Sequence, residues 1–215
     1  MTLLSQNIAD QLLQIKAIQL NPQNPYTWAS GLRSPIYCDN RQILSFPEAR
    51  KHVIFALARV SSEFADVDAI AGVATAGIPW GAYVADRLDL PYCYVRSKPK
   101  DHGLKNLIEG KIPTGSTVVV VEDLVSTGGS SFEAIEALKA EGMTIAGVVC
   151  IFHYGFTQTL QKFAENKVEC KSLTNFSILL ERSLHSQYIS GDDFTKLKSW
   201  NHNPKAWSDQ FQSSL

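Results

Sequence analysis

The residues best suited to chemistry form one stretch from Thr117 to Ser131, TVVVVEDLVSTGGSS. Four consecutive valines lead into two adjacent carboxylates, Glu122 and Asp123, and a turn of small and hydroxyl residues follows. An apolar β-branched run of this kind predicts a strand buried on both faces of a parallel sheet. The turn then lies at the carboxyl end of the strand, where open α/β sheets bind their ligands.

The turn has the composition of a phosphate-binding loop. Gly128 and Gly129 let the backbone approach a ligand closely, and the next helix start offers unpaired N–H groups and a positive dipole end. Hydroxyl groups come from Ser126, Thr127, Ser130 and Ser131. The turn is not a P-loop, because no Gly-Lys-Ser/Thr closes it, and the chain contains no GxGxxG motif.

The two carboxylates narrow the choice of ligand. They would repel a neighbouring phosphate unless they faced other groups, and ribose hydroxyls or a hydrated Mg²⁺ are the groups that carboxylates bind. The stretch therefore predicts a ribose 5-phosphate site. The simpler interpretation is a buried strand followed by an ordinary turn and helix cap.

Two further segments could serve the same chemistry. Residues 75–79, TAGIP, form a second small-residue loop between a buried strand and a helix. Residues 97–116 form a long polar connection whose basic side chains include Lys98, Lys100, His102, Lys105 and Lys111. Connections of this length in a compact domain are typically functional or disordered. The lysines therefore either serve the site or keep a mobile loop soluble.

The elements that must position these segments alternate along the chain. Buried strands are expected at 67–75, 91–96, 117–125 and 143–152, and helices at 3–18, from Pro47 to about 65, at 78–88 and at 130–142. This alternation requires right-handed crossovers and a mainly parallel sheet with helices on both sides, an α/β fold. Beyond Tyr154, we expect a helix to about 167, a strand at 168–173, and helices at 176–187 and 192–200.

Local signals also predict helix ends and an irregular N-terminal segment. Ser45-x-x-Glu48 and Ser130-x-x-Glu133 have the pattern of capping boxes, and Gly142 is the expected C-cap. Residues 20–45 are rich in Pro, Asn, Gly and Ser but also aromatic, which indicates strand pieces joined by turns. One domain over residues 1–215 accommodates all of these elements.

Composition limits the partners. The net charge of −1 and pI near 6.5 provide no basic field for nucleic acid or a membrane surface. The four cysteines show no CxxC spacing, and Cys93 and Cys150 lie in apolar strand-like runs, so reduced thiols are expected. The N-terminus lacks a basic start, and no apolar run approaches membrane-spanning length. We therefore expect a cytoplasmic protein.

The central stretch resembles the signature of the type I phosphoribosyltransferases, and three segments resemble the orotate phosphoribosyltransferases among them. SGLRSPIYCDNR (30–41) resembles their substrate hood, RSKPKDHG (96–103) their catalytic loop, and TAGIP their pyrophosphate loop. The resemblance covers about residues 26–155. It implies the type I phosphoribosyltransferase fold with a small N-terminal hood at about 20–45 and a mobile catalytic loop at about 97–112.

The resemblance also implies residue roles. Phosphoribosyl pyrophosphate would be bound by Glu122, Asp123, Leu124, Val125, Ser126, Thr127, Gly128, Gly129 and Ser130, by Thr75, Ala76 and Gly77, and by Arg96, Lys100 and His102. The two acids would hold the 2′ and 3′ hydroxyls, and the implied catalytic residues are Lys100, His102 and Asp123. Orotate would contact Ser126, Tyr37 and Arg41. Tyr37 and Trp28 could stack on the base, although Trp28 could equally serve packing alone.

The sequence departs from the pattern where the orotate carboxylate is bound. Some bacterial members have lysines in place of Ala29 and Ala76 and an arginine near His153. The carboxylate is then left to Arg33, Arg41 or backbone amides of residues 30–40. His153 follows a core strand at the expected active edge and has either a site role or a structural one. Ser97 replaces a further basic loop position.

The implied reaction displaces pyrophosphate from an anomeric carbon through an oxocarbenium-like state. Mg²⁺ would bridge the diphosphate and ribose oxygens, with no protein ligand assigned to it, and His102 could protonate the leaving group. The resemblance also implies a homodimer with active sites shared across the interface. The alternatives are transfer to a purine or to uracil, and a non-catalytic sensor of phosphoribosyl pyrophosphate on the same fold.

Overall fold

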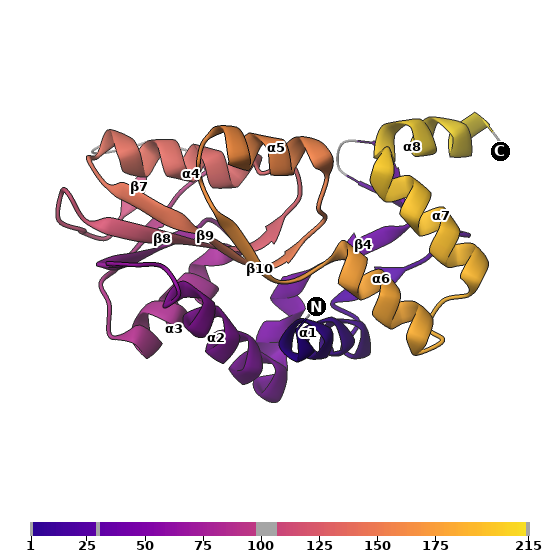
Figure 1. Cartoon of the computed structure of the whole chain (residues 1–215), viewed down its shortest axis with the longest axis horizontal. Helices are drawn as coiled ribbons and strands as arrows, with labels where there is room; N and C mark the ends of the chain where they lie inside the picture. The colour runs from indigo at the N-terminus through magenta and orange to yellow at the C-terminus, as the bar shows by residue number, and fades with distance from the viewer. Residues whose placement is uncertain (1, 29–30, 98–106, 214–215) are drawn as a thin grey trace.

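A computed structural model of the chain describes residues 2–28, 31–97 and 107–213. Its centre is a six-stranded sheet in the order β10-β9-β8-β5-β6-β7, in which every pairing is parallel except that of β7 with β6 (Figure 1). The strands are β5 (Ala69–Val73), β6 (Tyr92–Val95), β7 (Ile108–Glu109), β8 (Thr117–Val125), β9 (Thr144–His153) and β10 (Cys170–Asn175). The expected mainly parallel α/β sheet is confirmed.

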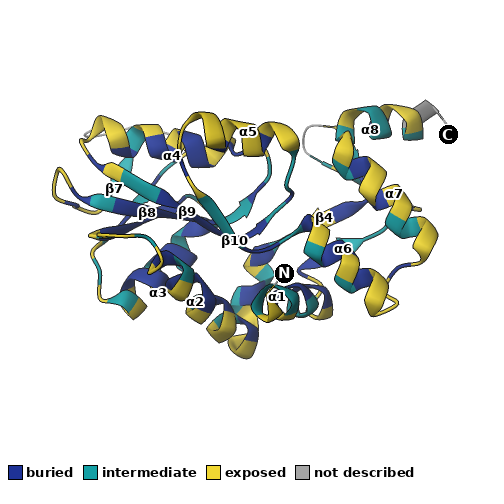
Figure 2. Ribbon diagram, in the orientation of Figure 1, coloured by how far each residue is buried: buried dark blue, intermediate teal, exposed yellow. Residues whose placement is uncertain are grey.

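Strand β8 lies inside the sheet, between β5 and β9. Successive side chains of a strand point to opposite faces, so the four valines divide between two hydrophobic cores. Val119 and Val121 belong to one core, and Val118 and Val120 belong to the other. All four are fully buried, and Figure 2 shows β8 buried beneath helices. The sequence prediction of a strand buried on both faces is confirmed.

Helices cover both faces of the sheet. Helices α2 and α3 lie on one face, and α4 and α5 lie on the other (Figure 1). Helix α1 packs against α6 and β10. Their bounds are α1 (Leu3–Gln14), α2 (Pro47–Ser61), α3 (Gly77–Leu88), α4 (Gly129–Ala140), α5 (Thr157–Glu165) and α6 (Phe176–His185).

The hood consists of two small antiparallel ladders, as the mixed composition of residues 20–45 predicted. Strand β1 pairs with β4, and β2 pairs with β3. The bounds are β1 (Ile18–Leu20), β2 (Tyr26–Thr27), β3 (Arg33–Ser34) and β4 (Ile36–Cys38), followed by the 3₁₀ helix η1 (Asn40–Ser45).

The capping box expected at α2 is wrong. Ser45 is the last residue of η1, so Phe46 occupies the N-cap, and no side chain of the described residues caps the helix. Pro47 stands in the first turn, as expected, because its fixed φ suits a position that needs no N–H donor.

The capping box expected at α4 is also wrong. Gly128 is the N-cap, and the hydroxyl of Ser130 donates to the carboxylate of Glu122 instead. The C-terminal signal was correct to within one residue. Glu141 is the C-cap, and Gly142 follows it with a φ of +81°, a left-handed conformation that favours glycine.

Two helices at the C-terminal end extend beyond α6 towards the hood (Figure 1). They are α7 (Gly191–His202) and α8 (Pro204–Ser213). Helix α7 was expected from the sequence and starts with a capping box between Ser190 and Asp193, whereas α8 was not expected. Among the described residues, no helix is both long and apolar enough to span a membrane.

Candidate active site

The phosphate loop, residues 126–130, joins the carboxyl end of β8 to the start of α4. Gly128 has a φ of +76°, which only glycine adopts at low cost. The hydroxyl of Thr159, on α5, donates to the main-chain oxygen of Ser126 at 2.8 Å and fixes the loop from the side. Because no described side chain caps α4, its first N–H groups remain available to an anion.

The acid pair at the end of β8 is held in two different ways. Glu122 is only 4% exposed, and its carboxylate accepts hydrogen bonds from Ser130 Oγ and from the N–H of Asp123, both at 3.1 Å. Asp123 is only half-buried. Glu122 therefore holds the phosphate loop through its hydrogen bond with Ser130, and Asp123 is the more accessible of the two acids.

Burial also changes the protonation of the acid pair. It raises the pKa of Glu122 well above its ordinary value, and the neighbouring charge of Asp123 raises that pKa further. Burial likewise raises the pKa of Asp123. Further hydroxyl donors or a cation would stabilise the charged form of these two buried acids.

The segment TAGIP lies against the acid pair, but only Thr75 and Ala76 of the expected loop precede α3, which already begins at Gly77. A Cβ atom on Gly77 would come within 2.6 Å of the carbonyl oxygen of Val121 and 3.4 Å of Glu122 Oε1. Glycine is therefore required for this loop to approach β8. Thr75 and Ala76 precede α3, which has no side-chain cap among the described residues, so a second helix N-terminus points to the same region.

Arg96 follows β6 and lies between the two loops. It lines a small pocket together with Ala74 and Ser130, and its guanidinium is 3.5 Å from the carboxylate of Glu109. Lys98, Lys100 and His102 lie outside the described residues, and so does Ala29.

A pocket of about 300 Å³ lies between the hood and the phosphate loop, and we call it the acceptor pocket. It is lined by Thr27, Trp28, Tyr37, Cys38, Leu124, Ser126 and Tyr154. Tyr37 and Ser126, which were assigned to the base from the sequence, thus lie together, and Leu124 joins them. The sequence reasoning missed Thr27, Cys38 and Tyr154. For the residues of the hood, the signal that could have indicated a binding wall was the high aromatic content of that segment.

Two other candidates lie elsewhere. Arg41 is an exposed residue paired with Asp39 at 2.6 Å, and it does not line the acceptor pocket. Its charge acts on the acid pair instead, where it lowers the pKa of Asp123 against the larger effect of burial. His153 lines a different pocket, of about 390 Å³, with Asn175 and Ile178, and burial lowers its pKa.

Arg33 has a structural contact of its own. Its main-chain N–H donates to Ser208 Oγ, so this part of the hood is tied to α8. Among the described residues, no group of three or more His, Cys, Asp or Glu side chains could hold a metal ion.

Comparisons with known proteins agree with this geometry. Residues 39–179 match the family model of the phosphoribosyl transferase domain. An orotate phosphoribosyltransferase from Phocaeicola vulgatus is 50% identical over 208 residues, which cover 96% of this chain and 98% of that protein. The chain belongs to the orotate phosphoribosyltransferase family.

Solved structures of orotate phosphoribosyltransferases share the fold. The enzyme from Aeropyrum pernix superposes with a TM-score of 0.74 at 30% identity, over 85% of this chain and 99% of that one. A UMP synthase from Leishmania donovani gives a TM-score of 0.78 at 25% identity, over 92% of this chain and 42% of that longer chain. The type I phosphoribosyltransferase fold implied by the sequence is confirmed. This orotate phosphoribosyltransferase family member is therefore a glycosyltransferase of pyrimidine biosynthesis.

Proposed function

We propose that the site transfers the 5-phosphoribosyl group of phosphoribosyl pyrophosphate to orotate, giving orotidine 5′-monophosphate and pyrophosphate. The observation that carries this proposal is that the acceptor pocket and the phosphate loop are built from neighbouring residues. Leu124 and Ser126 line the acceptor pocket and also belong to the stretch that forms the phosphate loop. A base in the pocket therefore lies next to a ribose 5-phosphate on the loop, which is the proximity that the transfer requires.

The donor half-site follows from backbone geometry. The N–H groups at the start of α4, including that of Ser130, and the hydroxyl of Thr127 suit the 5-phosphate. Asp123 is placed to accept from a ribose hydroxyl, and Glu122 supports it from the buried side. Main-chain atoms of Val125, Gly128 and Gly129 complete the cradle.

The leaving-group half-site is on the other side of the acids. Thr75, Ala76 and Gly77 offer main-chain donors at the start of α3, and Arg96 adds a positive charge. Lys100 and His102 belong to the proposed catalytic loop, where they would neutralise and protonate the departing pyrophosphate. Ordered closure of such a loop would also exclude water from the cationic sugar.

The donor set of the site fits Mg²⁺ bound mainly through the substrate. Hard oxygen ligands suit this ion, which usually keeps waters and takes one or two carboxylates plus phosphate oxygens. Asp123 and Glu122 are the carboxylates available. When bound, the ion would act as a Lewis acid on the diphosphate, and the residues described above would bind and orient the substrate.

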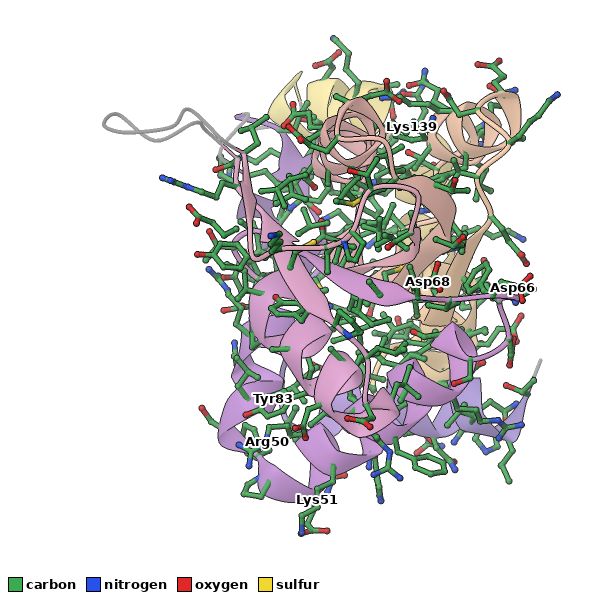
Figure 3. All side chains as sticks on the ribbon, turned by 90° about the vertical axis from the view of Figure 1, so that its left-hand side faces the viewer. Arg50, Lys51, Asp66, Asp68, Tyr83 and Lys139 are labelled. Atoms are coloured by element: carbon green, nitrogen blue, oxygen red, sulfur yellow. The ribbon has the colours of Figure 1, made fainter. Side chains whose placement is uncertain are left out.

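The proposed assembly is a homodimer with shared active sites. Helices α2 and α3 expose Phe55 and Tyr83, which are 54% and 39% accessible. Figure 3 shows these helices at the bottom of the view, with Tyr83 of α3 and Arg50 of α2 labelled there. The guanidinium of Arg87 lies 5.1 Å from the centre of the Phe55 ring, and exposed aromatic residues with a neighbouring arginine are typical of interface centres. The four cysteines are free thiols, which supports the cytoplasmic location proposed for the protein.

The decisive assay follows the loss of orotate absorbance in the presence of phosphoribosyl pyrophosphate and Mg²⁺. Adenine, hypoxanthine and uracil serve as competing acceptors, and a chelator serves as the metal control. We expect turnover that is specific for orotate and lost on chelation. Saturable binding of phosphoribosyl pyrophosphate without turnover of any base would instead indicate a sensor.

A further inference from the structure

The hood forms one wall of the acceptor pocket but has little structure of its own to hold it in place. The ladder between β2 and β3 pairs only two residues on each strand, and Trp28 directly follows it. Two-stranded ladders of this size are not stable in isolation. Some other part of the chain must therefore fix the hood over the phosphate loop.

Helix α7 supplies the first set of contacts, through Trp200. This side chain is fully buried, and its ring packs edge-on against Trp28 with 5.8 Å between centroids and an interplanar angle of 89°. It also packs against Tyr154, with 5.7 Å between centroids. Trp28 and Tyr154 both line the acceptor pocket, so Trp200 supports two of its walls from behind.

Hydrogen bonds on both sides of the pocket reinforce this packing. Ser208 of α8 is 1% exposed, and its Oγ accepts from the main-chain N–H of Arg33 at 3.0 Å. Asn201 of α7 donates through Nδ2 to the main-chain oxygen of Tyr154 at 2.8 Å. At the far end of the hood, Gln23 donates to the carboxylate of Asp193 at 2.8 Å.

We infer that α7 and α8 position the hood for acceptor binding, with Trp200 and Ser208 as the central positioning residues. Neither residue lines the acceptor pocket. Both lie outside residues 39–179, the part that matches the shared phosphoribosyl transferase domain, and so do the hood strands. The base-binding wall and its support are thus both additions to the common ribose-phosphate core. This inference rests on the proposed function.

The role predicts a selective defect. Loss of the support should weaken the binding of ligands that occupy the acceptor pocket. The affinity for ligands that occupy only the phosphate loop should not change. Orotidine 5′-monophosphate occupies both half-sites, and ribose 5-phosphate occupies only the loop. A comparison of the two affinities therefore separates positioning of the hood from general damage.

The test uses Ser208→Ala with Ser183→Ala as its matched control. Ser183 is also buried on a C-terminal helix, where its hydroxyl donates to the main-chain oxygen of Leu179, away from the hood. Trp200→Leu removes the aromatic ring, and Trp200→Phe restores one. The Trp200 indole N–H has no acceptor among the described residues, so phenylalanine loses ring area without losing a hydrogen bond.

We expect Ser208→Ala and Trp200→Leu to weaken orotidine 5′-monophosphate binding roughly tenfold, as for loss of one buried contact, with ribose 5-phosphate unchanged in titration calorimetry. The KM for orotate should rise in parallel while the KM for phosphoribosyl pyrophosphate stays constant, and Trp200→Phe should recover most of the loss.

Two outcomes would overturn the inference: equally weakened binding of both ligands, or variants whose affinities do not differ from those of Ser183→Ala. If Trp200→Leu does not fold, Ser208→Ala decides. An unmodified protein that binds ribose 5-phosphate but not orotidine 5′-monophosphate would overturn the proposed function instead.

Discussion

The side chain of Asn40 donates a hydrogen bond from Nδ2 to the main-chain oxygen of Asp123, at 2.8 Å. Asn40 is buried at the start of η1, directly after strand β4 of the hood, and Asp123 is the more accessible of the two acids at the end of β8. The Sγ of Cys38, which lines the acceptor pocket, is 3.5 Å from Asn40 Oδ1 and donates to it. One buried amide therefore connects the acceptor pocket to the proposed donor site.

Replacement of Asn40 by alanine tests this connection. The main-chain oxygen of Asp123 would lose its partner, at a cost of about 1–3 kcal/mol in the free energy of unfolding. We expect kcat/KM to fall about tenfold for both substrates, because the two half-sites lose their common anchor. The control is Asn166→Ala, which removes an exposed amide donor to the main-chain oxygen of Lys162. Unchanged kcat/KM despite lower stability would show that the bond is purely structural.

Glu122→Gln should stabilise the protein while lowering its activity. Folding raises the pKa of Glu122 above its ordinary value of 4.5, so the folded state retains a proton that the unfolded chain releases. The stability of the unmodified protein therefore falls as pH rises above about 4.5, and glutamine removes this loss.

Denaturant unfolding of the Glu122→Gln variant at acidic and neutral pH measures the effect. At neutral pH, we expect the free energy of unfolding of the variant to be higher than that of the unmodified protein by on the order of 1 kcal/mol or more. The difference should vanish below about pH 4. Activity should drop because glutamine keeps only one of the two oxygens that accept from Ser130 Oγ and from the N–H of Asp123, so the phosphate loop loses part of its support. Glu165→Gln, on the exposed surface of α5, is the control. A difference that does not depend on pH would contradict the raised pKa.

Gly77→Ala should disable the pyrophosphate loop. The added Cβ would lie 2.6 Å from the main-chain oxygen of Val121, and a backbone atom in a core strand cannot move aside at low cost. We expect a loss of roughly 1–3 kcal/mol in stability and a raised KM for phosphoribosyl pyrophosphate. Gly191→Ala is the matched control, because nothing lies within 4 Å of a Cβ built there. Equal behaviour of the two variants would refute the steric argument.

His102→Ala should lower kcat roughly 10²-fold with the melting temperature unchanged, as expected for loss of a general acid. The control is His185→Ala, at the exposed end of α6. Steady-state kinetics with saturating phosphoribosyl pyrophosphate measures the effect. If turnover is unaffected, His102 has no role in protonating the leaving group.

The sequence by itself determined the elements that form the proposed donor site, because they are local. The strand of valines, the acid pair and the small-residue loop are contiguous from Thr117 to Ser131, and strand, turn and helix start follow from neighbouring residue types. The alternating pattern likewise predicted the parallel sheet. Even here local rules failed once, since Ser130 bonds to Glu122, eight residues upstream, rather than capping α4.

Only the tertiary structure decided the acceptor pocket. Its walls come from residues 27, 28, 37, 38, 124, 126 and 154, which no local pattern connects. The same holds for the support of that pocket, because the contact of Trp28 with Trp200 joins residues 172 positions apart. Arg41 was assigned to orotate from the hood motif, but in the structure it pairs with Asp39 and does not line the acceptor pocket. Contacts between distant segments depend on how elements pack, and periodicity and spacing report only what each element is.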